Sequence, residues 1–425
     1  MLLKFLVLRI LVNIHLLFRE KGSRFRLFFI FMFKNNKNLF IIAIIAIVNA
    51  LGYGIIIPLL YSYSIKFGLN DFQNGLLFSL FSLCQFIATP LIGRLSDKYG
   101  RRPLLIISIS GTALSFLMMA FAPSAIFLFL ARALDGITAG NLPVASAVIS
   151  DTMEPKERAR GFGIIWGSFG FGFAIGPAIS AFTVGFGTTL PFIVAAIITF
   201  IAVAITFFFL PETNKNMGMT QKGPLFNFVK LARAVVDPDV GKTLLISLLY
   251  TFSFGAFIFA YQPVATKILG LNEQQISINF TIFGIVNLLT QFFLIQRVTR
   301  ALGEIRGLLS AILLAVAAFA GLFFARTYIW FTFIGMLLGV SNSFVNPLIQ
   351  SLISKETDAK SQGEILGVNA SYVSIGLIFG PIVAGFIATY SLPSPFLLGS
   401  VVCMACVFIT WLLKNHHDAR VVHLE

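Results

Sequence analysis

Charged residues are scarce in this chain of 425 residues, because Asp, Glu, Lys and Arg together make up 11% of it. An ordinary soluble domain is about a quarter charged. Hydrophobic residues account for 57% of the chain, and 48 of them are Phe. This composition excludes a water-soluble fold and indicates a protein that lies within a membrane.

Histidine and cysteine are also rare, with four and three residues. The histidines lie outside the long apolar runs, so no histidine relay can cross the membrane. The cysteines fall inside the runs, where small packing residues are expected. The connections between runs carry no His, no Cys, no acids with metal-ligand spacing and no nucleotide-binding glycine loop. We therefore expect no metal, no cofactor and no catalytic residues, which disfavours a membrane enzyme.

Long apolar runs are what the sequence has in abundance. A run of about 20 residues is long enough to cross a bilayer as a helix. The chain predicts an all-α membrane protein with twelve such spans. They are residues 39–62, 73–92, 104–121, 125–149, 162–183, 190–210, 243–263, 275–295, 306–325, 328–353, 364–389 and 395–413.

Basic residues are distributed unevenly about these spans. Of the 31 Lys and Arg residues, 27 lie in the two termini and in the connections after even-numbered spans. Basic residues concentrate on the cytoplasmic side of membrane proteins, so both termini are predicted to be cytoplasmic. The net charge of +14 is then a sign of topology, and no nucleic-acid partner is expected. The predicted location is the plasma membrane, as a bacterial inner membrane protein.

The chain divides into five segments. Residues 1–38 form an apolar and basic arm, which we interpret as a surface-lying helix or, for residues 1–31, an extension from a misassigned start codon. Residues 39–210 and 243–413 hold six spans each. Residues 211–242 form a polar linker with an expected amphipathic helix at residues 225–236, and residues 414–425 form a cytoplasmic tail.

An internal repeat relates the two sets of six spans. The loop that begins at Gly93 has a weaker copy 203 residues later, in which Gly303 corresponds to Gly100. The run Gly172-Phe-Ala-Ile-Gly176-Pro177 is echoed by Gly376-Leu-Ile-Phe-Gly380-Pro381, with an offset of 204 residues. Two unrelated motifs with nearly the same offset predict a duplicated six-helix unit.

The connection from Gly93 to Pro103, here called the Gly93 loop, has five charges between two spans. It resembles the signature loop between helices 2 and 3 of the major facilitator superfamily. The resemblance implies that Asp97 caps a helix of the opposite half and that Arg101 pairs with an acid at the foot of helix 4, here Asp151. These contacts would latch the outward-facing state. The predicted latch residues are Gly93, Asp97, Gly100, Arg101, Arg102 and Asp151.

Arg132 and Asp135 lie in the fourth span, in a segment that resembles the Arg-x-x-x-Gly motif of proton-coupled members of this superfamily. Asp135 is the only acidic residue clearly inside a span. A charge at this depth costs about 2.5–3.5 kcal/mol on insertion scales. The two residues are three apart and share a helix face, so pairing would offset part of that cost. Either Asp135 exchanges protons in a central cavity, or the pair is a permanent structural bridge.

The fifth span, with Gly172, Gly176 and Pro177, resembles the Gly-x-x-x-Gly-Pro antiporter motif. Ser180 and Ala181 stand where the family usually has glycines. Small residues four apart allow helix backbones to approach closely. Gly376, Gly380 and Pro381 are expected to pack in the same way.

The first span resembles that of tetracycline-type efflux pumps, in which an Asp is usual at the position of Asn49. Polar and aromatic residues near the middle of spans are candidates to line a substrate cavity, although many amides in membrane helices only join neighbouring helices. The candidates are Asn49, Tyr53, Gln85, Asn141, Tyr250, Gln262, Asn287, Gln291, Asn342, Asn346, Asn369 and Tyr372.

Together these resemblances imply a twelve-helix major facilitator fold of two six-helix bundles, similar to the drug:H+ antiporter branch. The expected function is transport of a small organic solute by alternating access, through proton-coupled multidrug-type efflux. The expected partners are this solute, protons and the lipid bilayer, with the chain acting as a monomer. A sugar or metabolite symporter or uniporter, and a non-transporting sensor with the same fold, remain alternatives.

Overall fold

The structure is a computed structural model that describes residues 37–154, 156–214, 217–218, 228–238, 240–357 and 361–422. The predicted arm, apart from its last two residues, lies outside the described residues. The same is true of the first part of the predicted linker helix, whose described part forms a helix from Phe228 to Val235.

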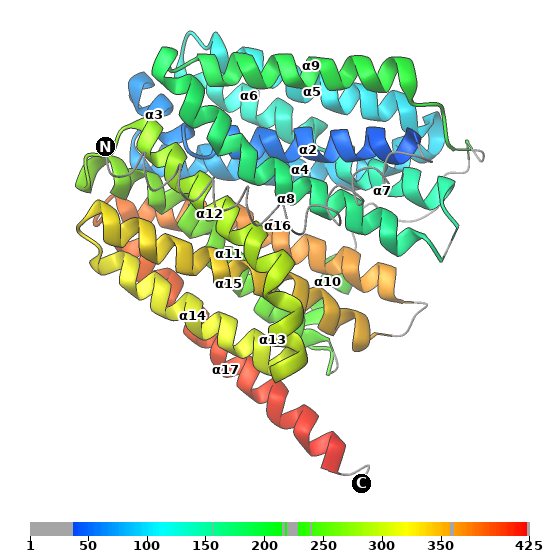
Figure 1. The fold of residues 1–425 in the computed structure, drawn as a ribbon, viewed down its shortest axis with the longest axis vertical. Helices are drawn as coiled ribbons and strands as arrows, with labels where there is room; N and C mark the ends of the chain where they lie inside the picture. Colours follow the sequence, from blue (N-terminus) through cyan, green and yellow to red (C-terminus); the bar gives the residue numbers. More distant parts are fainter. Residues whose placement is uncertain are drawn as a thin grey trace, which may run out of the picture.

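The described chain folds into helices that form two bundles, one above the other in Figure 1. The first bundle contains α2 (Lys37–Ile56), α3 (Leu60–Ser64), α4 (Asp71–Tyr99), α5 (Arg101–Ala120), α6 (Ala125–Thr138), α7 (Asn141–Thr152), α8 (Arg158–Thr183) and α9 (Leu190–Phe209). The linker contains α10 (Phe228–Val235). The second bundle contains α11 (Gly241–Pro263), α12 (Glu273–Phe293), α13 (Ile295–Leu302), α14 (Glu304–Phe324), α15 (Tyr328–Lys355), α16 (Gln362–Ala388) and α17 (Ser394–Val422).

Twelve of the described helical segments are long and apolar enough to cross a membrane. A helix satisfies its backbone hydrogen bonds internally, which a spanning segment must do because lipid offers no partners. Large apolar side chains such as Phe121, Phe208 and Ile329 are exposed on the outside of the bundles, as lipid contact requires. The prediction of an all-α membrane fold with twelve spans is confirmed.

Several helices differ in detail from the predicted spans. The first span ends at Ile56 and not at residue 62, because Pro58 interrupts it before the short helix α3. The fourth span is divided into α6 and α7, with Ala139 and Gly140 between them. The last helix continues beyond residue 413 to Val422, so most of the predicted tail is helical.

Within the first bundle, α8 packs directly on α2. A Cβ added at Gly172 would collide with the Ile47 carbonyl, and one added at Gly176 would lie 2.7 Å from the Cα of Gly54. The Ser180 hydroxyl donates to the Ile55 carbonyl at 3.0 Å. The glycines are therefore required for this close approach, and Ser180 adds a hydrogen bond between the same two helices.

The second bundle repeats this arrangement, with α16 packed on α11. A Cβ at Gly376 would collide with the Thr251 hydroxyl, and one at Gly380 would collide with the Phe252 carbonyl. The two glycine motifs thus occupy corresponding positions on α8 and α16, which are the fifth spans of the two bundles. Their expected packing role is present in both halves.

The two bundles meet along α4 with α16 and along α8 with α12. At the first seam, a Cβ at Gly385 would lie 3.0 Å from the Cα of Gly75. At the second, a Cβ at Gly284 would lie 2.7 Å from the Cα of Ala174. We call the end of the molecule that carries the Gly93 loop the basic end, and the opposite end the Pro58 end.

Candidate functional site

The Gly93 loop turns sharply between α4 and α5. Gly100 has φ of +106°, and it is both the C-cap of α4 and the N-cap of α5. Side chains other than hydrogen are strained at such an angle. A Cβ here would also collide with the carboxylate of Glu212. Gly100 is therefore fixed by conformation and by space.

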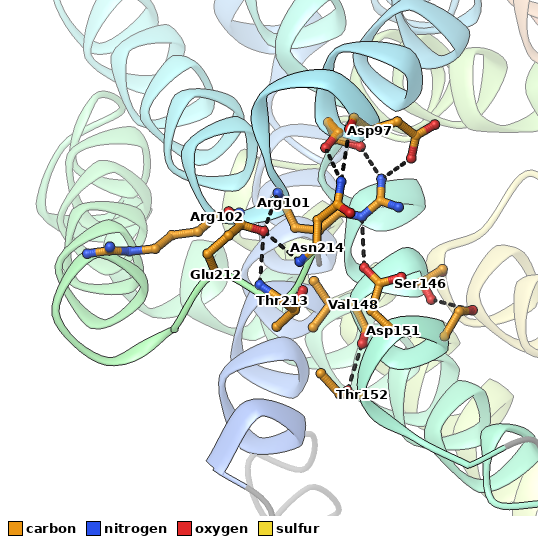
Figure 2. Close-up of polar contacts among 12 residues, drawn as sticks. Asp97, Arg101, Arg102, Ser146, Val148, Asp151, Thr152, Glu212, Thr213 and Asn214 are labelled. Atoms are coloured by element: carbon orange, nitrogen blue, oxygen red, sulfur yellow. Dashed lines mark hydrogen bonds and ion pairs between the residues drawn. The ribbon is translucent and has the colours of Figure 1, made fainter. Parts of the chain in front are cut away.

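Arg101 is the centre of the loop (Figure 2). Its guanidinium lies 2.5 Å from the Asp97 carboxylate and 3.0 Å from the Asp151 carboxylate. It also donates to the Ser96 hydroxyl at 2.7 Å. The Arg101 side chain is only 11% exposed, so water screens these pairs less than it would at an open surface. The predicted contact between Arg101 and Asp151 is present, and it joins the start of α5 to the end of α7.

Glu212 was missed by the sequence interpretation, which treated it as the beginning of the linker. Its carboxylate accepts hydrogen bonds from the backbone amides of Arg101 at 2.9 Å and Arg102 at 3.1 Å. Figure 2 shows this carboxylate at the first turn of α5. A negative charge at a helix N-terminus is stabilising, because the helix dipole is positive there. The signal that could have found it is that α5 begins with Gly-Arg-Arg and has no acid in its first turn.

Two further contacts tie the Gly93 loop to α9 and to the linker that follows it. The Asn214 amide donates to the Asp97 carbonyl at 2.9 Å. Arg102 reaches to α9, where its guanidinium donates to the Phe207 carbonyl at 2.5 Å and lies over the Phe207 ring. The segment after the sixth span is thereby fixed to the loop between the second and third spans.

Asp97 directs its carboxylate to Arg101 within its own bundle. The cap that it is expected to form on a helix of the opposite bundle belongs to the outward-facing state, and that role stays a prediction. Gly93 has no atom within 4 Å of an added Cβ, so the space around Gly93 does not demand a glycine.

Arg132 and Asp135 form a buried ion pair on α6. Arg132 Nη1 lies 3.4 Å from Asp135 Oδ2, and the two side chains are 7% and 10% exposed. The Arg132 guanidinium lies 4.6 Å above the Phe81 ring of α4, a cation–π contact of about 2 kcal/mol when desolvated. Its Nε is buried without a hydrogen-bond partner in the described part of the chain. One donor of the guanidinium is thus unpaired among the described residues.

Four of the predicted cavity residues form two contacting pairs in the same bundle. The Tyr53 ring of α2 packs edge-on against Phe81 with centroids 4.8 Å apart. Its hydroxyl points to the Gln85 amide oxygen at 3.5 Å. Asn141, at the start of α7, accepts a hydrogen bond from the Asn49 amide of α2. The first bundle therefore brings polar groups from α2, α4, α6 and α7 into one region.

The candidates in the second bundle are arranged differently. The Tyr372 hydroxyl donates to the Leu231 carbonyl of α10 at 2.6 Å, and so it holds the linker helix. Gln262 is fully buried and bonded to the backbone of the first bundle. Among the described residues, the buried Oδ1 atoms of Asn342 and Asn369 have no hydrogen-bond partner.

A cavity-lining role stays a prediction for all the candidates, including the four that follow. Tyr250 is buried in the core of α11. Gln291 is exposed, and its amide oxygen lies 3.7 Å from a Cβ placed at Gly170 of the first bundle. Asn287 and Asn346 are half-buried.

This two-bundle architecture is that of a known protein family. The model described as the Major Facilitator Superfamily matches residues 42–238 and 243–423. The chain belongs to the major facilitator superfamily. It is a multi-pass membrane transporter and not an enzyme, and the division of the match agrees with two bundles joined by a linker.

Curated relatives within the superfamily are resistance proteins. The chain is 30% identical over 361 residues to the class G tetracycline resistance protein of Vibrio anguillarum, which covers 83% of this chain and 90% of the relative. It is 29% identical over 367 residues to the class B tetracycline resistance protein of Escherichia coli, covering 84% and 90%. It is 27% identical over 385 residues to multidrug resistance protein 2 of Bacillus subtilis (strain 168), covering 89% and 96%.

Solved structures of superfamily members share the fold. A peptide transporter in complex with sulfate has a TM-score of 0.74 at 14% identity, covering 91% of this chain and 96% of the other. The human organic anion transporter TETRAN has a TM-score of 0.68 at 21% identity, covering 88% and 99%. These similarities confirm the two-bundle major facilitator fold.

Proposed function

We propose that this transporter exports a small organic, amphipathic compound in exchange for protons. The observation that carries the proposal is the buried Arg132–Asp135 pair, which lies among polar groups of four helices in the first bundle. The resistance proteins named above are similar to the chain over most of its length, which supports efflux. The chain acts as a monomer in the bilayer and has no nucleic-acid partner.

Asp135 is the proton carrier in this proposal. An ionised carboxylate at membrane depth is costly, about 2.5–3.5 kcal/mol on insertion scales. Arg132 offsets part of that cost at 3.4 Å. At this distance a competing anion can replace Asp135 as the partner of Arg132, or a proton can replace Arg132 as the partner of Asp135. When Asp135 is protonated, the guanidinium is released toward the Phe81 ring and the substrate. Proton binding and substrate binding are then coupled through one cation.

The basic end faces the cytoplasm. This orientation follows from the concentration of Lys and Arg in the connections at that end. It places both termini in the cytoplasm and the Pro58 end outside. The protein is a component of the bacterial inner membrane in this proposal.

The Gly93 loop acts as the latch of the outward-facing state. The ties of Arg101 to Asp97 and Asp151 keep the loop in a fixed shape. From that shape, Asp97 can be presented to the opposite bundle when the basic end closes.

Transport by purified protein in proteoliposomes with an imposed pH gradient tests the proposal. Tetracycline and a panel of fluorescent lipophilic dyes serve as substrates, and proton movement is followed with an internal pH dye. The Asp135→Asn variant keeps the size of the side chain but cannot be charged. We expect it to lose uptake driven by the pH gradient by at least about 100-fold, as is typical when an essential proton-transfer group is removed.

The matched control is Glu157→Gln, which neutralises an exposed acid next to α8 and should transport like the parent. If Asp135→Asn retains full proton coupling, the pair is a structural bridge and the proposed role of Asp135 is wrong.

A uniporter is the second candidate, because Asn49 cannot titrate and its amide is occupied by Asn141. Dissipation of the proton gradient distinguishes the two. An antiporter loses concentrative transport in this condition, whereas a uniporter equilibrates its substrate at the same rate.

A further inference from the structure

The first span is broken at Pro58, and the break separates two backbone groups that would otherwise bond. In an uninterrupted helix the amide of Tyr61 donates to the carbonyl of Ile57, four residues earlier. Here α2 ends at Ile56 and α3 begins at Leu60. Because such groups are costly to leave unpaired in a dry interior, the chain must supply another partner.

That partner is Gln262 of the other bundle. Its Nε2 donates to the Ile57 carbonyl, and its Oε1 accepts from the Tyr61 amide at 3.0 Å. Gln262 is fully buried and lies on α11, next to Pro263. One carboxamide thus takes the place of the missing helical hydrogen bond, and it does so from across the boundary between the bundles.

Charged residues surround this contact. Lys267, which follows α11, donates to both oxygens of the Asp71 carboxylate at 2.8 and 3.1 Å. The same carboxylate accepts from the Tyr61 hydroxyl. Asp71 is 13% exposed in its side chain and Lys267 is 42% exposed. Farther out, Lys66 and Glu273 lie 3.5 Å apart, and an exposed pair of this kind contributes little.

The backbones of the bundles also touch close to this point. A Cβ at Gly75 would lie 2.5 Å from the Pro381 carbonyl of α16. The Gln274 amide donates to the Ala181 carbonyl at 3.0 Å, which adds a contact between α12 and the end of α8. The Pro58 end is therefore closed by side-chain and backbone contacts that join the two bundles.

We propose that Gln262 is a gating residue, which holds the Pro58 end closed by bridging Ile57 and Tyr61, and that the Asp71–Lys267 pair supports it. In an alternating-access cycle this end must open, so both hydrogen bonds of Gln262 must break once per cycle. The freed Ile57 and Tyr61 groups then bond to each other or to water. The bend of the first span therefore changes with the gate. The inference rests on the proposed transport cycle, but not on its substrate or its coupling to protons.

Distances between spin labels on the two bundles test the gate without any substrate. One label pair is placed at the Pro58 end through Phe186→Cys and Tyr390→Cys, at side chains that are 75% and 80% exposed. A second pair is placed at the basic end through Glu154→Cys and Ser361→Cys, which are exposed on opposite bundles. The native cysteines are replaced by alanine in this background.

The Gln262→Leu variant removes both hydrogen bonds and retains bulk. We expect a new population at longer distances at the Pro58 end and, in the same sample, a population at shorter distances at the basic end. A purely structural loss would broaden both distributions without this reciprocal change. Gln262→Glu, measured at a pH at which the carboxyl group is ionised, keeps the acceptor for Tyr61 and replaces the donor for Ile57 by a second acceptor, so it should shift the distances in the same directions.

Gln350→Leu is the matched control, since it removes an exposed amide of α15 and should leave both distributions like those of the parent. Parent-like distances in folded Gln262→Leu and Gln262→Glu would overturn the gate. If Gln262→Leu does not fold, Gln262→Glu decides alone. A shift of the distances in a protein that transports none of the tested compounds would leave the gate standing and count against the proposed substrate class.

Discussion

The Gly93 loop of the first bundle and its counterpart in the second share a glycine with positive φ but differ in the charge of the residue that follows it. Gly100 and Gly303 both have positive φ, +106° and +78°. Gly100 precedes α5 and Gly303 precedes α14, which are the third spans of their bundles. The next residue is Arg101 in the first bundle and Glu304 in the second. The glycine turn is thus present in both bundles, while the charge that follows it is reversed.

The ion pairs made by these residues are reversed in the same way. Arg101 binds Asp151 at 3.0 Å, near the end of the fourth span, and Glu304 binds Lys355 at 2.9 Å, at the end of the tenth. Both pairs join a helix start to the end of the next span. Both bundles thus have an ion pair between these two positions, and the acid and the base can occupy either position.

The first bundle has an additional requirement that the second does not. An Arg at the first position of α5 is unfavourable beside the positive end of the helix dipole. Glu212 of the linker supplies the missing negative charge, whereas α14 has Glu304 in its own first turn. The first bundle therefore depends on the linker, and the second is self-sufficient at this position.

The largest effect is expected from Arg101→Ala. This change leaves Asp97 and Asp151 close to each other without their shared cation, in a place where Arg101 is 11% exposed. We expect a loss of about 2–3 kcal/mol, below the figure for a fully buried pair. Denaturation in detergent, followed by tryptophan fluorescence, measures it. A loss no greater than that of Lys355→Ala would contradict the difference between the halves.

A charge swap tests whether the ion pair of the first bundle can also form with the acid and the base exchanged. Arg101→Glu and Asp151→Lys, made singly and together, form a double-mutant cycle. We expect the pair to be less destabilising than the sum of the single changes, by about 1–2 kcal/mol, which is within the range for residues in contact. The double variant should remain less stable than the parent, because Glu212 and Asp97 would face a carboxylate. Additive effects would show that the tie requires an arginine at this site.

Glu212→Gln examines the dependence on the linker. The amide keeps one acceptor and loses the charge at the start of α5, so we expect a loss of about 1 kcal/mol, as for a helix cap. The melting temperature in detergent at low and high salt gives the electrostatic share. Lys242→Gln, a neutralisation in the first turn of α11, should have no comparable effect.

The smallest effect is expected from Lys355→Ala. Its side chain is 67% exposed, and exposed ion pairs contribute about 0.5 kcal/mol or less. Its melting temperature should match that of the parent within the error of the scan. A strong destabilisation would mean that the second tie is as important as the first, and the asymmetry would be lost.

Sequence alone predicted the spans and the two-bundle fold, because the spans depend on long patterns of apolar residues and the fold on the motifs that resemble the superfamily. It also predicted the contact of Arg101 with Asp151, since the resemblance supplied the partner. It did not predict the break at Pro58, because the first span was expected to run without interruption to residue 62. A proline within a span can bend a helix or end it, and the outcome depends on whether a neighbour satisfies the freed backbone groups.

The parts of the site that escaped prediction are single polar residues in long-range contact. Glu212 lies 111 residues from Arg101, and nothing local to Pro211-Glu212-Thr213 indicates that the carboxylate caps α5. Gln262 lies 205 residues from Ile57, and an amide near the end of a span is equally compatible with a cavity wall. Such partners are identified only in the folded chain, although the absence of an acid in the first turn of α5 shows that a cap is missing there.

The seams between the bundles consist of glycine against glycine at Gly75 and Gly385, and of glycine against alanine at Gly284 and Ala174. Surfaces this smooth have no ridges that lock into grooves, so one body can tilt on the other without repacking its core. A bulky side chain at these positions would block this tilt. Such a variant would still bind its substrate but would transport it slowly.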